Sequence, residues 1–567
     1  MRIACRPRTC VLHSDCSRDW RFGCSSAVLL QVKRAGLRLH RRDGRALTPW
    51  ESGPATVSVS MATNRSSAVP ELDLWQLADP DPDQQVRPRG ETGAGTSRTD
   101  RLIALIEEEG VELFHDQSCE AFARVPVGNH KEVLRCRSRG FRGWLAKLFW
   151  EREGKVPRLE PPNPTMSVIM AKALYGGDKH TLHNRVARQD RVLWLDLADE
   201  EWRAVKVTDT GWSVVSSPPT LFRRYSHQQP LPEPSGGGDL RGLLDFVNLS
   251  DESQRLLLMV YVVSCLIPDI PHPILVLSGP QGSAKTTLLR MLRRLVDPSE
   301  LEELSFPRRE DELIQQLSHH WVSCYDNMSS IPTAMSDVLC RAVTGLGYSK
   351  RELYTDDDDV IYRFRRCIAM NGINVVAQEP DLLDRSIVLA LRSIPPEERK
   401  PEGELMEGFE AKRPLLIGGI LDALSCAMEL RESVTMARLP RMADFALWGC
   451  AIAEALGYSS DEFASAYECN AKARNEEALQ ASPVAAMVAE LMEHRREWEG
   501  TATELLEALI PLAQRHSVST KAAGWPRAPH VLRRRLNEVL PNLAAVGIEI
   551  VPSRDARKRT VTILKSS

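Results

Sequence analysis

The central third of this 567-residue sequence predicts an α/β fold, with a parallel β-sheet covered by helices. Three observations support this. Short apolar runs alternate with helical patterns from Ile274 to about Leu391. The first run leads through a glycine-containing turn into an amphipathic helix, and polar residues stand beside the later runs. Because open α/β sheets bind ligands at one edge, we expect these polar residues to meet there.

The turn after the first strand reads Gly279, Pro280, Gln281, Gly282, Ser283, Ala284, Lys285, Thr286, Thr287. This pattern is typical of a phosphate loop, in which backbone N–H groups and the positive end of a helix surround the β- and γ-phosphates. Lys285 supplies a mobile ammonium and Thr286 a hydroxyl for Mg²⁺. Ala284 replaces the usual glycine, which we expect to be tolerated if its backbone is helical. The sequence therefore predicts a nucleoside triphosphatase that uses ATP and Mg²⁺. The alternative, a chance glycine-rich turn, fits the flanking strand and helix less well.

Three further polar residues complete the candidate catalytic set. Asp326 ends the apolar run Trp321–Tyr325 and is expected to anchor Mg²⁺ with Thr286. Asn371 ends a later run and is suited to orient the attacking water or contact the γ-phosphate. Arg385 precedes the last run and is a candidate arginine finger for a neighbouring subunit's nucleotide. Each has a structural alternative: a strand-end cap, a turn residue and a surface ion pair. The ordered set is more specific than any member.

The block from Gly279 to Leu391 resembles the ATPase core of superfamily-three helicases, the primase-helicases of satellite phages, poxviruses and plasmids within the AAA+ class. The resemblance rests on the short spacing of the first two motifs, the strand ending in Asn371, and the segment Thr344–Tyr354, similar to that family's "TG...R.LY" motif. It implies a ring oligomer, a homo-hexamer, that unwinds or translocates DNA, with Lys350 and Arg351 contacting single-stranded DNA in a central channel. A primase is an implied partner, because we find no complete primase site in the chain.

Asn327 departs from the family pattern, which places a glutamate beside the aspartate to accept a proton from the attacking water. An amide cannot do so. Hydrolysis is then slow, uses another acid such as Asp337, or depends on positioning and charge stabilisation. Two other functions stay open: a nucleotide-gated DNA-binding or loading module with weak hydrolysis, and an ATPase of phage defence or plasmid partition.

The flanking regions divide by composition. Residues 1–100 are predicted to be a disordered extension and linker: 1–60 are arginine-rich and acid-poor, like a transit peptide or an over-long reading frame before Met61, and 61–100 are rich in proline and glycine. Residues 101–230 predict an α+β auxiliary domain with helices at 102–109 and 141–150 and strands at 192–197, 204–207 and 211–215. In that domain, Asp196 and Asp199 are better explained by a surface turn than by a metal-binding pair. Residues 230–238 predict a flexible linker.

The core with its preceding helices occupies 239–395, and a helical domain follows at 396–480. Residues 482–567 show the order helix, helix, helix, hairpin, typical of a winged helix. Its third helix carries Arg533, Arg534 and Arg535, and its hairpin tip carries Arg557, Lys558 and Arg559. Basic charge on both elements favours DNA contact over an ordinary solvated turn. The acidic run Asp356–Asp359 is explained by a solvated hairpin tip.

Whole-chain properties exclude several classes. The formal net charge of -3 argues against a uniformly basic nucleic-acid coat. The 13 cysteines include no CxxC pair, which disfavours a zinc ribbon or a disulfide framework and fits a reducing cytoplasm. No stretch approaches the roughly 18–20 apolar residues that span a bilayer.

Overall fold

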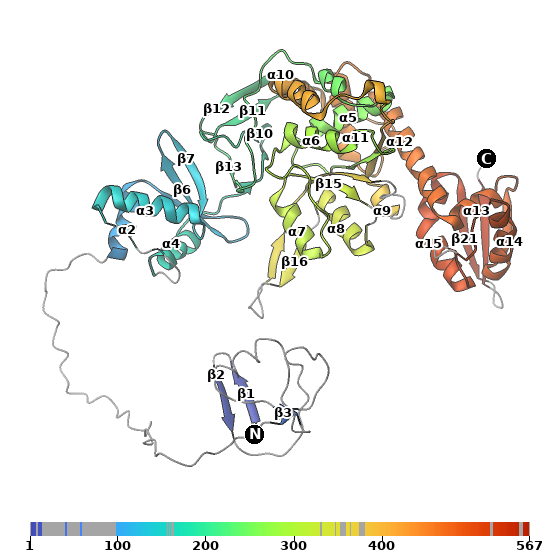
Figure 1. The fold of residues 1–567 in the computed structure, drawn as a ribbon, viewed down its shortest axis with the longest axis horizontal. Helices are drawn as coiled ribbons and strands as arrows, with labels where there is room; N and C mark the ends of the chain where they lie inside the picture. The colour runs from blue at the N-terminus through green and yellow to red at the C-terminus, as the bar shows by residue number, and fades with distance from the viewer. Residues whose placement is uncertain are drawn as a thin grey trace. The chain divides into compact units, whose positions relative to one another are not determined.

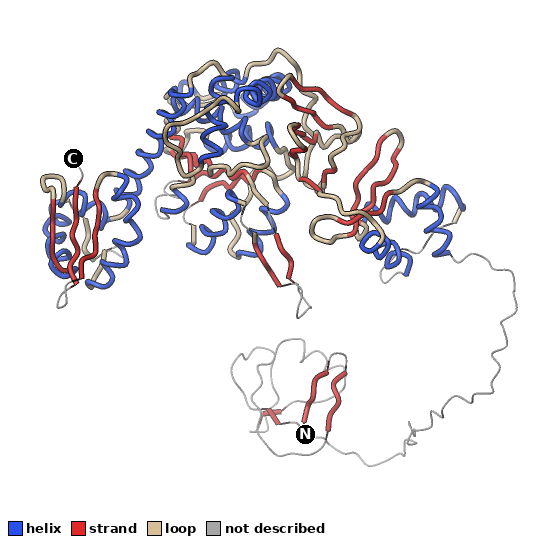
Figure 2. The backbone as a smooth tube through the Cα atoms, turned by 180° about the vertical axis from the view of Figure 1, so that it is seen from behind, coloured by secondary structure: helices blue, strands red, loops and turns tan. Residues whose placement is uncertain are grey.

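The computed structural model describes residues 2–6, 9–13, 40–41, 57–58, 98–155, 157, 159, 164–328, 331–345, 347–351, 359–362, 364–372, 380–516, 518–521, 525–554 and 559–565 (Figures 1 and 2). Contacts divide the chain into two units, Met1–Ala94 and Gly95–Ser567. In the first unit, β1 (Arg2–Arg6) pairs with β2 (Thr9–His13), and β3 (His40–Arg41) with β4 (Val57–Ser58), all antiparallel. These strands differ from the predicted disorder, and most of residues 1–100 lies outside the described ranges.

The second unit begins with a three-stranded antiparallel sheet and three helices. The sheet comprises β5 (Glu112–His115), β6 (Ala121–Val127) and β7 (His130–Arg135), with β6 central. Ala121, Ala123 and Val125 alternate along β6 and pack against the helices. These helices are α2 (Arg98–Glu108), α3 (Arg139–Glu153) and α4 (Pro164–Tyr175).

A second β-region follows. A four-stranded antiparallel sheet has the order β12 (Gly211–Val215), β11 (Ala204–Thr208), β10 (Val192–Asp196), β9 (Val186–Gln189), and β8 (Leu182–His183) pairs in parallel with β13 (Leu221–Phe222). The carboxylate of Asp196 pairs with Arg224 at 2.6 Å, and that of Asp199 with Arg203 at 2.6 Å. The two carboxylates are thus held by different arginines. The sequence predicted a surface turn at Asp196 and Asp199, but Asp196 is only 2% exposed and is therefore buried.

A buried ion cluster joins this β-region to the core. Arg185 Nε lies 2.9 Å from Asp297 Oδ1, and Arg293 Nη1 lies 3.3 Å from Asp297 Oδ2, with all three side chains fully buried. Burial alone would raise the pKa of Asp297, but Arg293 and Arg185 hold it well below its usual range. The ionised carboxylate also accepts the backbone N–H of Trp321 at 2.9 Å. Removing Asp297 would leave two buried cations without compensation, so the cluster fixes the β-region against the core.

The core sheet is parallel, with the order β15 (Val322–Met328), β18 (Cys367–Gly372), β14 (Ile274–Ser278), β19 (Ser386–Ala390). Alternate residues of β14 serve opposite faces. Leu275 and Leu277 pack with α5 (Glu252–Ser264) and α6 (Lys285–Val296). Ile274 and Val276 pack with α7 (Glu310–His319) and α8 (Thr333–Thr344). The predicted parallel sheet covered by helices is confirmed, and the helices lie on both of its faces.

Shorter elements flank this sheet. The predicted helical stretch before the phosphate loop is divided between a 3₁₀ helix, η1 (Leu240–Phe246), and α5, which Asp251 caps by accepting the N–H of Gln254. The hairpin of β16 (Tyr348–Arg351) and β17 (Asp359–Tyr362) and the short helix α9 (Pro380–Leu383) precede β18 and β19 respectively. A second 3₁₀ turn, η2 (Pro396–Glu398), follows β19.

Residues 230–238 do not form the flexible linker that the sequence predicted. They pack against α10 (Glu402–Leu430), which is followed by α11 (Ala443–Ala455) and α12 (Ser460–Ala481). The N–H of Ser235 donates to Pro414 O at 3.0 Å, and a Cβ added at Gly238 would lie 1.8 Å from Leu415 O. A Cβ added at Gly418 would lie 1.9 Å from Ser235 O. Glycine here permits close backbone contact rather than flexibility.

Gly418→Ala is therefore expected to destabilise the second unit by about 3 kcal/mol, because the added methyl must displace a backbone carbonyl. Gly403→Ala on the same helix has nothing within 4 Å of the new Cβ and should be neutral or stabilising. Urea unfolding of both variants measures the difference. Equal effects would contradict the close packing of residues 235–238 on α10.

The C-terminal region has its own hydrophobic core. Its elements are α13 (Pro483–Leu491), β20 (Glu497–Thr501), α14 (Ala502–Arg515), α15 (Pro529–Ala545), β21 (Ile548–Arg554) and β22 (Arg559–Lys565). The sheet is antiparallel with the order β20, β22, β21. The predicted helices and hairpin are present, whereas β20 was not predicted. Among the described residues, no helix combines the length and apolar character that crossing a bilayer requires.

Candidate nucleotide-binding site

The turn between β14 and α6 is shaped by three residues with positive φ: Gly279 (139°), Gly282 (74°) and Ala284 (64°). A Cβ on Gly279 would lie 2.4 Å from Leu391 O, so this position requires glycine. Lys285 curls back into the loop and its Nζ donates to the carbonyls of Gly279 at 2.9 Å and Pro280 at 2.8 Å. The ammonium thus lies within the turn that the sequence identified.

Ala284 is not helical, and the expectation that it would be was wrong. It is the N-cap of α6 and adopts the left-handed conformation, with φ 64° and ψ 31°. That conformation costs an L-residue roughly 1–2 kcal/mol because its Cβ crowds the backbone. The loop therefore keeps the geometry that glycine usually provides, at the expense of strain.

Ala284→Gly is expected to raise the free energy of unfolding by about 1 kcal/mol, because relief of left-handed strain exceeds the entropy that glycine adds to the unfolded chain. Ala334→Gly, in the first turn of the right-handed helix α8, should instead lower it by about 1 kcal/mol. Thermal or urea unfolding measures both. If both substitutions destabilise the protein, residue 284 is not strained.

Asn371 joins the phosphate-loop helix to the neighbouring strand. It is the second-last residue of β18, which lies between β14 and β15, and it is 2% exposed. Its Nδ2 donates to Asp326 Oδ1 and, at 3.3 Å, to Thr286 Oγ1. Thr286 Oγ1 donates to Asp326 Oδ1 at 2.9 Å. A hydroxyl and a carboxylate in contact are the hard oxygen ligands that Mg²⁺ prefers, so these residues fit the expected ion.

Asn327 has a conformational reason to be an amide. The register between β15 and β18 shifts between Tyr325 and Met328, and Asn327 has φ 54°. Asparagine tolerates this left-handed conformation far better than glutamate does. Its N–H donates to Asn371 Oδ1 at 2.7 Å, while the residue itself is exposed. The register shift is a β-bulge, and at this bulge the backbone of β15 is hydrogen-bonded to the Asn371 side-chain amide.

Asp337, the alternative acid, lies on α8 and is exposed. Its charge influences the nearby Cys340 thiol. Burial raises the pKa of that thiol to about 12, Arg385 lowers it, and the carboxylates of Asp381 and Asp337 raise it further. Among the described residues it makes no hydrogen bond to Asp326, Asn371 or Thr286.

Arg385 lies at the opposite edge of the sheet, and the expectation that it shares an edge with Asp326 and Asn371 was wrong. It precedes β19, and its carbonyl accepts the N–H of Ile274, the first residue of β14, at 2.8 Å. The phosphate loop follows the far end of β14, about 16 Å away at 3.3 Å per residue. Its guanidinium pairs with Asp381 at 2.5 Å, and its side chain is 15% exposed.

Arg399 was not predicted. The segment after β19 passes over the phosphate loop: the N–H of Leu391 donates to Ser278 O at 2.9 Å, and that of Ile394 to Gly282 O at 3.3 Å. Arg399 Nη2 lies 3.4 Å from the position of a Cβ on Gly282, while its Nε donates to Ile394 O at 3.1 Å. Arg399 lies near the phosphate loop because of the path that its segment takes over the loop. No local sequence pattern predicts this position.

The candidate DNA contacts occupy two hairpins and one helix. Lys350 and Arg351 lie in β16 opposite Val360 and Asp359 of β17. On α15, the side chain of Arg534 is 68% exposed, and Arg535 pairs with Glu538 at 2.9 Å. The side chains of Lys350, Arg351 and Arg559 lie outside the described part, as do Arg557, Lys558 and Asp356–Asp358 entirely.

Two replication-protein family models match this chain. Residues 240–470 match the model described as actinomycete integrative conjugative element replication protein. Residues 484–567 match the AICE RepA C-terminal domain. The first match contains the phosphate loop and the Asn371 contacts, and the second contains α15 and the terminal hairpin. No curated protein matches the sequence.

Similar solved structures are distant. The apo structure of the NrS-1 C terminal region (305-718) is 11% identical and covers 82% of this chain and 98% of that chain, with a TM-score of 0.37. A structure of JCV helicase bound to a thiazolopyridine acetamide is 15% identical and covers 39% of this chain and 71% of that chain, with a TM-score of 0.20. These similarities are too low to assign a function.

Proposed function

We propose that this chain is an ATP-dependent DNA helicase or translocase that acts in the replication of an integrative conjugative element. The observation that carries the proposal is the contact of Thr286, Asp326 and Asn371 beside the loop that holds the Lys285 ammonium. Residues from three separate segments of the chain meet there. The matched replication-protein models supply the biological setting.

Each residue of the site has a chemical role in this proposal. The N–H groups of Gly279–Thr287 and the Lys285 ammonium bind the β- and γ-phosphates. Thr286 and Asp326 hold Mg²⁺, which neutralises charge on the phosphates when bound. Asn371 fixes the Asp326 carboxylate and orients the attacking water. Arg399, above Gly282, adds a cation from the same chain.

The position of Arg385 supports the proposal of a ring. Since it lies a full strand length from its own phosphate loop, a role at the γ-phosphate requires the loop of a second copy. We therefore propose an AAA+ homo-hexamer in which Lys350 and Arg351 line a DNA channel. The C-terminal region acts as a winged helix on DNA, through Arg533, Arg534 and the hairpin tip at Arg557–Arg559, and a primase acts as a separate partner.

The test is ATP hydrolysis by the full chain with and without single-stranded DNA, together with displacement of a labelled strand. We expect DNA to stimulate hydrolysis and ATP to drive displacement. Hydrolysis without displacement would favour an ATPase of defence or partition. Absence of ATP binding in the wild-type chain, with Lys285→Ala as the reference, would refute the nucleotide site itself.

Asn327 favours a second candidate function, a nucleotide-gated DNA-loading module with weak hydrolysis. Asn327→Asp is the sharper test than Asn327→Glu, because aspartate tolerates the left-handed backbone that residue 327 adopts. If DNA does not stimulate ATP hydrolysis and neither substitution raises turnover, the nucleotide-gated loading module explains the results better than the helicase does. A gain in turnover from Asn327→Asp would instead show that the motor lacks only a proton acceptor.

A further inference from the structure

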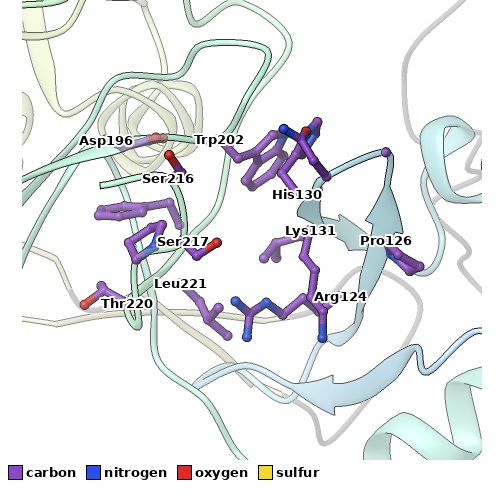
Figure 3. Close-up of a pocket in the computed structure, with 15 residues that line it drawn as sticks. Arg124, Pro126, His130, Lys131, Asp196, Trp202, Ser216, Ser217, Thr220 and Leu221 are labelled. Atoms are coloured by element: carbon purple, nitrogen blue, oxygen red, sulfur yellow. The ribbon is translucent and has the colours of Figure 1, made fainter. Parts of the chain in front are cut away.

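A pocket with mixed polar and apolar walls, outside the nucleotide site, lies between the β6–β7 hairpin and the segment that contains Ser216 and Ser217 (Figure 3). Its volume is about 410 Å³, within the usual range for small-ligand sites. Arg124 and Lys131 line it on the hairpin side, and Trp202 and the two serines line it from the second β-region. In Figure 3, Arg124 extends from its strand toward Leu221.

The strand pattern places both cations on the pocket face. Phe122 and Arg124 share one face of β6, and the pairing of β6 with β7 sets Lys131 opposite Pro126 on that face. Phe122 is buried in a small apolar cluster with Leu221. The two cations therefore line the pocket together with apolar side chains, which include Leu221.

Trp202 forms part of the opposite wall. The Arg224 guanidinium lies 4.0 Å from its ring centroid, so one ring face carries a cation while the residue still borders the pocket. Its φ of 56° is unusual for a bulky residue, and such strain persists where the surroundings fix a side chain in place. Arg224 also pairs with Asp196 at 2.6 Å, which compensates the carboxylate that lines the pocket.

The charge balance of the walls favours an anion. Arg124 lies 3.7 Å from Glu112, a longer pair that leaves guanidinium donors available, and His130 lies 3.5 Å from Glu132. Lys131 makes no ion pair within the part of the chain that the structure describes. Two permanent cations thus face a cavity whose lining aspartate is already neutralised.

We propose that this pocket binds one nucleotide of single-stranded DNA. Arg124 and Lys131 contact the phosphate, Trp202 offers a stacking surface for the base, and Ser216 and Ser217 present polar groups toward the sugar. A basic groove combined with an aromatic platform is the chemistry by which proteins bind single strands without sequence preference. The site does not depend on ATP, so its failure and that of the proposed ATPase are separable.

The first experiment measures the affinity of the full chain for a fluorescent oligothymidine by anisotropy across a salt series. Arg124→Ala/Lys131→Ala should weaken binding by about 10-fold and reduce the salt slope by roughly 0.7, since both side chains contact one phosphate and each neutralised phosphate on a single strand contributes about that amount. Lys172→Ala, on α4 and paired with Glu107, removes charge from the same domain without touching the pocket. It should leave the slope unchanged, and all variants should keep their DNA-free ATPase.

The second experiment locates the contact. Photo-crosslinking of 5-iodouracil-substituted oligothymidine should label the Trp202 peptide, and Trp202→Leu should abolish that label while Trp202→Phe retains it. An unchanged salt slope in the double variant, or no label in that peptide, overturns the proposal. A third result would also overturn the proposal. If thymidine 5′-monophosphate binds the pocket while the double variant keeps its affinity for the oligonucleotide, the pocket binds a free nucleotide instead of single-stranded DNA.

Discussion

Arg385→Ala is expected to lower ATP turnover by about 10³-fold or more while leaving ATP affinity intact, as loss of an arginine finger does. The reason is geometric. Arg385 lies at the start of β19, the full length of β14 from its own phosphate loop, and makes no contact there among the described residues. A finger at this position therefore acts on the nucleotide phosphate of a neighbouring copy.

Mixing two inactive chains tests that reasoning directly. Lys285→Ala removes the phosphate-binding lysine, and Arg385→Ala removes the finger, but a mixed interface can combine an intact loop from one chain with an intact arginine from the other. In a randomly mixed ring, about a quarter of the interfaces are complete, so turnover should recover to about a quarter of the wild-type rate. Steady-state ATPase at a fixed total protein concentration measures it.

The matched control is Arg441→Ala. Arg441 lies at the same edge, where it pairs with Asp381 at 2.8 Å and with Asp384. Its loss changes the charge of that edge without removing the candidate finger. An equal loss of turnover in this variant would assign the effect to the electrostatics of the edge. No recovery on mixing, in a preparation that still forms oligomers, would contradict action between subunits.

The contact of Asp326 with Asn371 was predictable because chain connectivity determines it. Both residues lie near the carboxyl ends of parallel strands, and parallel strands present those ends at one edge. Arg385 was predicted at the wrong edge. It comes before its strand, whereas Asp326 and Asn371 come late in theirs, and this order is visible in the sequence. The left-handed backbone of Ala284 and Asn327 was not predictable from their identity, since local propensity favours a helix for alanine and the loop geometry overrides it.

Contacts between distant segments were also missed, for a related reason. The glycines at 236–238 look like a linker by composition, yet Gly238 and Gly418 are needed for backbone contact with α10. Arg399 reaches the phosphate loop only because the segment after β19 crosses over Gly282. The strand β20 contains one apolar residue between two glutamates, so its pattern alone is too weak to indicate a strand.

Asn371→Asp is expected to destabilise the protein without Mg²⁺ by about 3 kcal/mol and to lower turnover by about 10²-fold or more. The substitution keeps the shape of the side chain but replaces the Nδ2 donor with an oxygen that faces Asp326 Oδ1 and Thr286 Oγ1. Two carboxylates then share a site whose residue 371 is 2% exposed. Such neighbours cannot both ionise unless a proton or a cation compensates them.

Thermal unfolding with and without Mg²⁺ separates this explanation from a simple packing defect. Because a divalent cation binds the paired carboxylates of the folded state, Mg²⁺ should raise the melting temperature of Asn371→Asp more than that of the wild type. Asn537→Asp, an exposed amide on α15, should match the wild type in stability, Mg²⁺ response and turnover. Full activity in Asn371→Asp would show that the amide donor to Asp326 is dispensable, since aspartate keeps the shape of the side chain and, when ionised, has no donor to offer.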